Sequence, residues 1–470
     1  MQLLATPDPV QVTYTGSFLE LLELDNDMLK FIHAAMTSSS KRVPIPANGV
    51  DYRGKVVLAP MVRSGELPSR LLALKYGADL VWGPETIDRS MIGAGRRVNP
   101  RNGTIEFTRI PSNGKKGVPI QESVIYRLDP AREKGKLIFQ LGTASPETAV
   151  EAAKMVAADV AGIDVNSGCP KPFSTLGGMG AALLRTPDKL VSILESLVKE
   201  VGEPYQIGIS VKIRLLETPE LTESLVSRLV QTGITGLTIH CRTTPMRPRE
   251  RAIRDQLQMI VSTCHAAGVA CIINGDVASR DQALSLMTEY GADGGMIATA
   301  AEANSSCFRS EADGGLAPWR DVVYEYLKFC LESENRFGNT KYLMNILIPG
   351  KDKQFSHARN SRSYVDFCRI LRFDDLIPSA QVLDELLDLT SKSITTPKST
   401  SAAVQNAKDK NHTARAASSA PRSKPTSPAP INGVGPIRTN SIPKPTRSED
   451  KSANADVPTV PVTQNQELTA

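Results

Sequence analysis

Eight short apolar runs recur between residues 50 and 317 of the 470-residue chain. None of them alternates between apolar and polar positions, as a strand with one face in water would. Continuous apolar runs rich in β-branched residues are typical of strands buried on both faces. The runs are VVLA (56–59), DLVWG (79–83), KLIFQLG (136–142), VAGIDVN (160–166), IGISVKI (207–213), GLTIH (236–240), ACIIN (270–274) and GGMIA (294–298).

Helical patterns separate most of these runs. Apolar residues at helical spacing fill 148–157, 188–200, 221–233 and 280–292, and several of these segments end near Gly, which is common at helix C-termini. Eight buried strands alternating with helices over about 250 residues predict a (β/α)8 TIM barrel. We therefore assign residues 50–317 to an α/β barrel domain. A doubly wound sheet is the alternative, but no GxGxxG segment follows the first run.

The periodicity changes after the eighth run. Residues 319–334, 340–348, 362–373 and 379–389 all have helical spacing, and no strand run lies among them. Residues 318–390 are therefore predicted to form a small all-helical domain.

The two ends of the chain have different compositions. Residues 391–470 hold ten of the 32 prolines, no Phe, Tyr or Trp, and eleven Lys or Arg against five Asp or Glu. This composition predicts a disordered basic tail, either merely solvated or attracting phosphates non-specifically. Residues 1–49 form an irregular extension whose acidic residues precede the first basic one, Lys30. That order excludes a mitochondrial presequence, and Met36 could serve as an internal start.

Composition limits the class of protein. With 22% charged residues and no run of eighteen apolar residues, the sequence predicts no membrane-spanning helix. Its seven cysteines lack the paired spacing of zinc sites or disulfide frameworks, so we expect no metal and a reducing compartment. The expected location is the cytoplasm, with the nucleus as a further location, and the expected state is a monomer.

Polar residues follow most of the predicted strands. The carboxyl ends of barrel strands meet at one end of the barrel, where enzymes of this fold build their sites. This set offers cations, amides and one thiol, but no carboxylate pair and no metal cluster, which disfavours glycosidases and metal-assisted hydrolysis. The residues are Ala59, Pro60, Met61, Gln140, Asn166, Cys169, Lys212, Arg214, His240, Arg242, Asn274, Gly275, Asp276, Ala298 and Thr299.

Two kinds of chemistry are indicated at these strand ends. Loops after the seventh and eighth strands of such barrels often bind phosphate, and Lys212 and His240 could hold a planar ring by its carbonyl oxygens. A phosphate site and a site for a planar ring together suggest flavin mononucleotide (FMN) or a nucleotide substrate. Cys169 lies in a Gly-rich loop beside Lys171, where a thiol could act as nucleophile or as proton donor.

Six ordered segments of the chain resemble the tRNA-dihydrouridine synthases. The likeness is greatest to the eukaryotic type, in a fungal-like form, that reduces uridine 20 of the D-loop, and it covers roughly residues 50–375. The segments are APMVRSGELPSRLLALKYGADLVWGPETID, FQLGTA, GIDVNSGCPKPFSTLGGMGAALL, VKIRLL, IHCRTTPMRPRERA and INGDVASRDQA.

The resemblance implies a mechanism and a role for each matching residue. Cys169 would be the general acid that protonates C5 of the uracil, while FMN delivers hydride to C6 and NADPH, or NADH, reduces the flavin. Asn166 and Arg214 would hold the uracil, and the helical domain would bind tRNA. Residues implied to contact FMN or its phosphate are Ala59, Pro60, Met61, Gln140, Lys212, His240, Asn274, Gly275, Asp276, Ala298 and Thr299.

Basic residues are placed to hold the RNA backbone. On the loop after the sixth strand these are Arg242, Arg247, Arg249 and Arg251. In the helical domain they are Lys351, Lys353, Arg359 and Arg362. Phosphate contacts of this kind would make binding fall with salt.

The chain departs from the family pattern in two places. Many relatives have a loop like ARAAMWNP where this chain has ATAAEANSS, so Thr299 replaces an arginine and Ala303 a tryptophan. Also, the animal form carries a double-stranded-RNA-binding domain after the helical domain, and here only the tail follows. Two alternatives stay open: a flavin-dependent barrel that reduces a small molecule, similar to dihydroorotate dehydrogenase, and an inactive RNA-binding relative.

Overall fold

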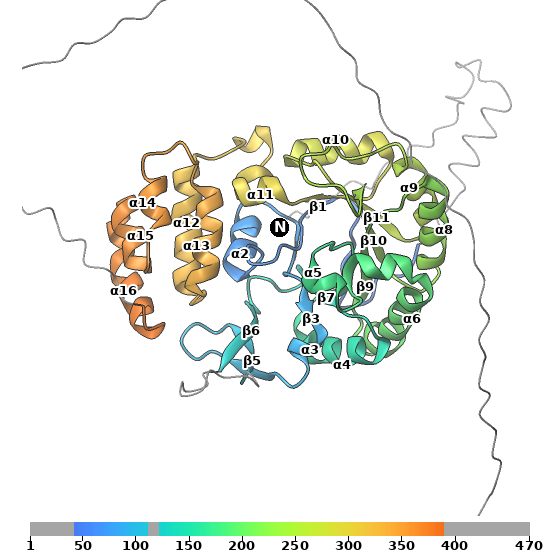
Figure 1. The fold of residues 1–470 in the computed structure, drawn as a ribbon, viewed down its shortest axis with the longest axis horizontal. Helices are drawn as coiled ribbons and strands as arrows, with labels where there is room; N and C mark the ends of the chain where they lie inside the picture. The colour runs from blue at the N-terminus through green and yellow to red at the C-terminus, as the bar shows by residue number, and fades with distance from the viewer. Residues whose placement is uncertain (1–41, 111–121, 390–470) are drawn as a thin grey trace, which may run out of the picture. The chain divides into compact units, whose positions relative to one another are not determined.

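The computed structural model describes residues 42–110 and 122–389, which belong to one compact unit (Figure 1). The predicted tail, 391–470, and most of the N-terminal extension lie outside the described residues. Within the described ranges, no helix is long and apolar enough to cross a membrane.

Eight parallel strands close into a barrel, which confirms the predicted fold class. The hydrogen-bonded order runs from β2 through β1, β12, β11, β10, β9 and β8 to β7, and a further pairing of β2 with β7 closes the ring. A short strand, β3 (Thr86–Ile87), follows β2 and also pairs with β7. The barrel strands are β1 (Lys55–Leu58), β2 (Leu80–Trp82), β7 (Leu137–Gly142), β8 (Gly162–Ser167), β9 (Gly208–Leu215), β10 (Gly236–Thr243), β11 (Ala270–Asn274) and β12 (Gly294–Ile297).

The barrel strands have two buried faces, which explains their continuous apolar runs. In β1, Val57 packs inside the barrel with Trp82 and Ile272, whereas Val56 and Leu58 pack outward under the helices. Every residue of β8 and of β11 is buried. A buried polar position needs an internal hydrogen-bond partner, and Asp164 of β8 has one in Ser210 of β9, which donates to it at 2.8 Å.

Helices surround the barrel, and three of them begin at a side-chain N-cap (Figure 1). The side chains of Ser145, Thr218 and Ser279 each accept a hydrogen bond from the backbone N–H three residues later. Proline is the first residue of four of the helices around the barrel, where its missing N–H is harmless. The helices are α2 (Leu67–Lys75), α3 (Asp88–Met91), α4 (Pro146–Val156), α5 (Pro172–Thr175), α6 (Pro187–Leu197), α7 (Glu203–Tyr205), α8 (Pro219–Leu229), α9 (Leu257–Ala266), α10 (Arg280–Tyr290) and α11 (Thr299–Ala303).

A three-stranded antiparallel sheet is inserted between β3 and β7, and the sequence did not lead us to expect it. Its strands are β4 (Gly95–Val98), β5 (Ile105–Arg109) and β6 (Ser123–Leu128), with β5 in the centre. Phe107 and Tyr126 pair across β5 and β6 and are buried against the barrel core.

Helices follow the barrel where the sequence predicts them, and they belong to the same compact unit as the barrel. These helices are α12 (Trp319–Glu332), α13 (Phe337–Leu347), α14 (Phe355–Arg359), α15 (Tyr364–Leu371) and α16 (Ile377–Leu386), of which only α14 lacked a predicted segment. Helix α12 packs on α2, and α13 packs on α11, so the bundle lies beside the barrel (Figure 1).

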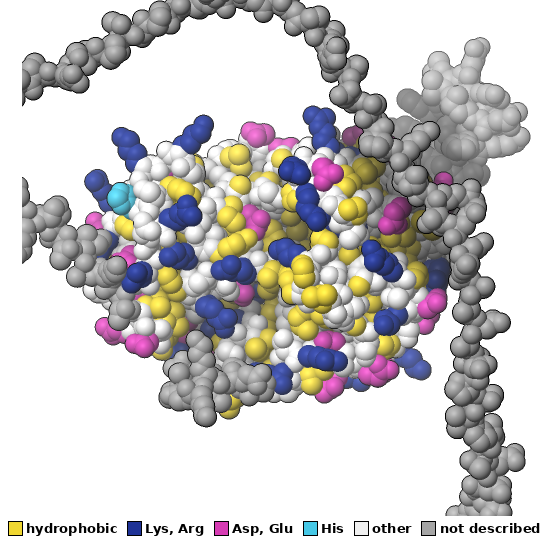
Figure 2. Space-filling model, viewed as in Figure 1, with side chains coloured by type: hydrophobic (Ala, Val, Ile, Leu, Met, Phe, Trp, Pro, Cys, Tyr) yellow, Lys and Arg dark blue, Asp and Glu magenta, His cyan; other side chains and the backbone are white. Residues whose placement is uncertain are grey.

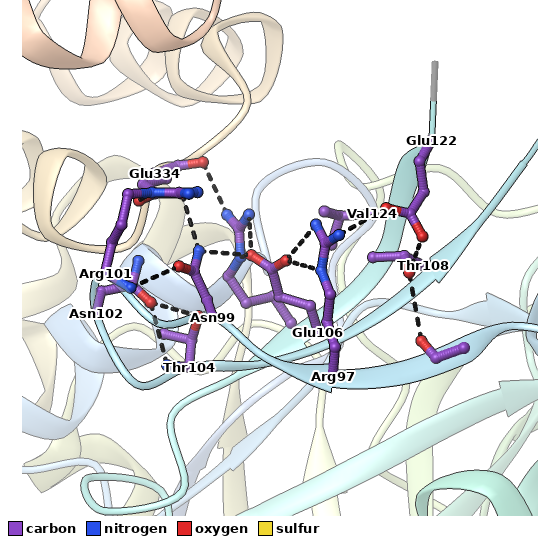
Figure 3. A network of polar contacts seen from close by, with 12 residues as sticks. Arg97, Asn99, Arg101, Asn102, Thr104, Glu106, Thr108, Glu122, Val124 and Glu334 are labelled. Atoms are coloured by element: carbon purple, nitrogen blue, oxygen red, sulfur yellow. Dashed lines mark hydrogen bonds and ion pairs between the residues drawn. The ribbon is translucent and has the colours of Figure 1, made fainter. Parts of the chain in front are cut away.

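A network of ion pairs joins the small sheet to the turn between α12 and α13 (Figure 3). The buried carboxylate of Glu106 is paired with Arg97 and with Arg127 at 2.9 and 2.7 Å. Asn99 donates to Glu106 at 3.1 Å and to Glu334 at 2.9 Å. Arg127 also donates to the carbonyl oxygen of Glu334 at 2.8 Å. These bonds fix the start of α13 relative to the barrel.

Candidate active site

The carboxyl ends of the barrel strands surround a cavity of about 290 Å³. Because adjacent parallel strands are in register, Gln140 lies opposite Asp164, Asn166 opposite Lys212, and His240 opposite Arg214. Ten of the residues predicted from the sequence line this cavity. They are Pro60, Met61, Gln140, Asn166, Cys169, Lys212, Arg214, His240, Ala298 and Thr299.

A buried carboxylate lies beneath the cavity. Asp164 accepts hydrogen bonds from Gln140 Nε2 and from Ser210 Oγ, both at 2.8 Å. Burial raises the pKa of Asp164 to about 6, against the lowering effect of these two donors. The bond to Asp164 also fixes the orientation of the Gln140 amide at the edge of the cavity.

A desolvated cation and a neutral imidazole stand side by side in the cavity. Burial, followed by the nearby Arg214 charge, lowers the pKa of Lys212 to about 8. The structure shows no hydrogen bond or ion pair from the Lys212 ammonium to another described residue. Burial and then the charge of Lys212 lower the pKa of His240 to about 2, so its ring is uncharged at neutral pH. The pair can therefore bind acceptor atoms of a ligand.

The loop that carries Cys169 is held from both sides. The Asn166 side-chain oxygen accepts hydrogen bonds from the backbone N–H groups of Gly168 and Cys169, at 3.0 and 3.1 Å. Arg214 donates from Nε to the carbonyl oxygen of Gly168 at 2.7 Å. These bonds anchor the first turn of the loop to β8 and β9, and they leave the Cys169 side chain at the cavity.

Cys169 is a thiol rather than a thiolate in this setting. It is partly exposed, whereas the other six cysteines are buried. Burial raises the pKa of Cys169, and the neighbouring Glu85 carboxylate raises it further. A nucleophilic cysteine needs a lowered pKa, whereas a proton donor must keep its proton until the reaction. The electrostatics therefore favour proton donation, one of the two roles that the sequence alone left open.

The comparison with known families supports this geometry. The model of the dihydrouridine synthase (Dus) family matches residues 57–346, which run from within β1, through the other seven barrel strands, to the end of α13 but for one residue.

The chain belongs to the Dus family.

Curated relatives of this Dus family member include two fungal proteins. The chain is 51% identical over 322 residues to the Schizosaccharomyces pombe tRNA-dihydrouridine(20) synthase [NAD(P)+], covering 67% of this chain and 64% of the relative. It is 44% identical over 330 residues to the Saccharomyces cerevisiae protein of the same name, covering 69% and 84%. The mouse tRNA-dihydrouridine(20a/20b) synthase [NAD(P)+]-like protein is 26% identical, covering 66% and 86%. The match thus spans slightly less than two thirds of the S. pombe protein.

Four predicted residues of this Dus family member lie next to the cavity rather than in its lining. Ala59 is buried and lies directly after β1. Asn274 donates to the carbonyl oxygen of Met296 at 2.9 Å, which joins β11 to β12. Gly275 has φ of +116°, a conformation that side chains with Cβ rarely adopt, and it packs against His240. Asp276 is ion-paired with Arg242.

The four predicted arginines of the loop after β10 divide into two groups. Arg242 is buried and donates to the carbonyl oxygens of Glu250 and Pro248 at 2.7 and 3.2 Å, so it holds the loop together. Arg247, Arg249 and Arg251 are exposed on that loop. Only this second group has guanidinium groups at the surface.

Seven lining residues were not predicted from the sequence, and four of them have side chains that carry a charge or a hydroxyl group. Glu85 follows β2, Lys171 follows Cys169, and Glu302 lies on α11, where it accepts a hydrogen bond from Ser64. Tyr342 comes from α13, and the Arg63 guanidinium stacks over its ring with 4.5 Å between the charge centre and the ring centroid. The helical domain thus contributes a side chain to the cavity. Across residues 42–110 and 122–389, no cluster of three His, Cys, Asp or Glu could hold a metal ion.

Proposed function

We propose that this chain reduces a uridine of tRNA to 5,6-dihydrouridine, at position 20 of the D-loop, with FMN as cofactor and NADPH or NADH as reductant. The observation that carries the proposal is the protonated thiol of Cys169 at the same cavity as the unpartnered ammonium of Lys212. The names of the two fungal relatives supply the substrate and the position.

The residues of the cavity fit a flavin. Its ring presents carbonyl oxygens and ring nitrogens, and the cavity offers Lys212, the neutral ring of His240 and the oriented amide of Gln140. Gly275 allows a close backbone approach where the resemblance implies the phosphate. A phosphate bound by backbone N–H groups tolerates Thr299 in place of the family's arginine. When bound, FMN supplies the hydride that adds to C6 of the uracil.

The chain's own residues then position the uracil and protonate it. Asn166 and Arg214 hold the loop of Cys169 and also line the cavity, so they fix the thiol relative to a uracil bound there. Cys169 donates its proton to C5, and the thiolate that remains regains a proton before the next turnover. A positioned general acid typically contributes about 10²–10⁴-fold to the rate.

The target base must be turned out of the tRNA fold to reach this cavity, so the RNA backbone has to be held outside it. The exposed Arg247, Arg249 and Arg251 lie on the loop after β10, beside the cavity residues of that strand. In the helical domain Lys351, Lys353, Arg359 and Arg362 are exposed. Figure 2 shows Lys and Arg side chains spread across the face that includes the bundle and the barrel.

Incubation of the full chain with FMN, NADPH and an unmodified tRNA transcript tests the proposal. Mass spectrometry of ribonuclease fragments should show a gain of two hydrogens at uridine 20. A transcript with cytidine at position 20 is the control and should stay unmodified at that position. Reduction of orotate without any reaction on tRNA would instead favour the small-molecule alternative, and a protein that binds tRNA but no flavin would favour the inactive relative.

A further inference from the structure

We infer that Glu85 is a positioning residue for Cys169. The Glu85 carboxylate keeps the Cys169 thiol protonated and directed into the cavity. The inference rests on the proposed function in one respect, because it takes the Cys169 thiol to be the proton donor. It concerns a residue in the segment after β2, whereas the cysteine loop follows β8.

The fold builds a confined space for the Glu85 side chain. Glu85 lies between β2 and β3, and β3 pairs with β7 so that Ile87 is opposite Gly142. A Cβ atom at Gly142 would come within 2.7 Å of Glu85 Oε1, so only glycine leaves room for the carboxylate there. The carboxylate is thereby held at the cavity that it shares with Cys169.

The loop of Cys169 folds back onto this carboxylate. Ser174, a buried residue of α5, donates from Oγ to Glu85 Oε1 at 2.9 Å. A Cβ atom at Gly180 would come within 2.4 Å of Ser174 Oγ and 2.6 Å of the Cys169 carbonyl oxygen, so the loop is tightly closed at this point. One carboxylate oxygen is thus fixed by the same loop that carries the thiol.

The second carboxylate oxygen, Oε2, is buried and has no hydrogen-bond partner among the described residues. A buried carboxylate oxygen without a hydrogen-bond donor is unfavourable. The Cys169 thiol is close enough for Glu85 to influence its ionisation both by charge and by hydrogen bonding. Besides Ser174, the side chains of Cys169 and Asn166 are the ones placed to act on this carboxylate, and on this inference the thiol is the donor that Oε2 lacks.

Glu85 is the negative charge that acts most strongly on Cys169, and it opposes several positive charges there. Lys171, Lys212 and Arg214 all favour the thiolate through their charges. Burial raises the pKa of Cys169 first, and Glu85 raises it next. Without the carboxylate, the three cations would act unopposed and shift the cysteine toward the thiolate, which has no proton to give to C5.

Alkylation of Cys169 by iodoacetamide as a function of pH tests this inference directly, because only the thiolate reacts. The measurement uses the full chain with bound FMN, and mass spectrometry identifies the alkylated cysteine; the other six are buried. Glu85→Gln keeps the shape and an acceptor for Ser174 but removes the charge. It should move the alkylation midpoint about one pH unit lower, which is about tenfold faster alkylation near pH 7.5.

Ser174→Ala is the matched control, since it removes the hydrogen bond to Glu85 and leaves the charge. A purely structural role for Glu85 would give the same profile in both variants, and an unchanged profile in Glu85→Gln would overturn the inference. If Glu85→Gln does not fold, Glu85→Asp withdraws the carboxylate by one methylene and should shift the midpoint in the same direction by less.

The pH dependence of uridine reduction separates this inference from the proposed function. In Glu85→Gln, the turnover number should decline at a lower pH than in the unaltered protein, because the thiol ionises earlier. A shifted alkylation profile in a protein that makes no dihydrouridine would support the pairing and contradict the function. If Glu85→Gln and the unaltered protein both form dihydrouridine and have identical alkylation profiles, the result would support the function and contradict the pairing of Glu85 with Cys169.

Discussion

Lys212 should make FMN binding depend on pH. In the free protein its pKa is about 8 instead of the ordinary 10.5, because the ammonium is buried beside Arg214. At about 1.4 kcal/mol per pH unit, this lowering corresponds to about 3 kcal/mol of unfavourable desolvation and repulsion. A flavin oxygen bound next to the Lys212 ammonium would offset this unfavourable free energy. Lys212→Met, which carries no charge, should therefore lose up to about 3 kcal/mol, or roughly 100-fold, in FMN affinity at pH 7.

The direction of the pH effect follows from the direction of the pKa. A lysine whose pKa is lowered carries its charge below about pH 8 and loses it above that value. The FMN dissociation constant, measured by quenching of flavin fluorescence, should thus be constant from pH 6 to pH 7.5 and then rise by about tenfold per pH unit. Lys212→Arg keeps its charge and should show a flat profile. A flat profile in the unaltered protein, or unchanged affinity in Lys212→Met, would refute the reasoning.

Three further results are expected. Glu133→Ala should lower the free energy of unfolding in urea by about 3–5 kcal/mol, because it removes the partner of a fully buried arginine. In the unaltered protein the Arg70 guanidinium is paired with Glu133 at 2.6 Å. A loss below about 1 kcal/mol would contradict this expectation. Replacing Arg247, Arg249 and Arg251 together by Ala should weaken tRNA binding and reduce its salt slope by about 2 to 3, and an unchanged slope would remove this loop from the RNA interface. Truncation after Thr390 should cost little tRNA affinity in the same salt series; a large loss would assign RNA recognition to the tail.

The barrel and much of its cavity could be predicted from the sequence, for a physical reason. Strands buried on both faces need continuous apolar runs, and a parallel barrel brings the residues at their carboxyl ends together. Gln140, Lys212 and His240 could therefore be placed at one cavity without knowledge of any contact. The apolar runs also predicted the ends of all eight strands to within a few residues.

The residues that were missed depend on tertiary contacts that no periodicity reports. Glu85 follows a strand of only three residues and reads as an ordinary loop carboxylate, and its burial depends on Gly142 of a neighbouring strand. Tyr342 reaches the cavity only because α13 packs on α11. The inserted sheet was missed because β4 is exposed along its whole length and thus has no apolar run.

Arg242 shows the limit of reasoning from composition. In the sequence it stands with Arg247, Arg249 and Arg251 as one basic cluster. In the structure β10 continues through it, and its guanidinium is taken up by loop carbonyl oxygens and by Asp276. Charge and spacing alone do not distinguish a buried arginine that holds a loop from one available to RNA.

The central claim is that Cys169 donates the proton to the uracil, and separating the two half-reactions of Cys169→Ala tests it most directly. In stopped-flow absorbance, the flavin of this variant should be reduced by NADPH at the rate of the unaltered protein, since the change removes only the proton donor. Oxidation of the reduced flavin by tRNA should then be slower by about 10²–10⁴-fold. Oxidation at the unaltered rate, with dihydrouridine formed in the tRNA, would contradict the account.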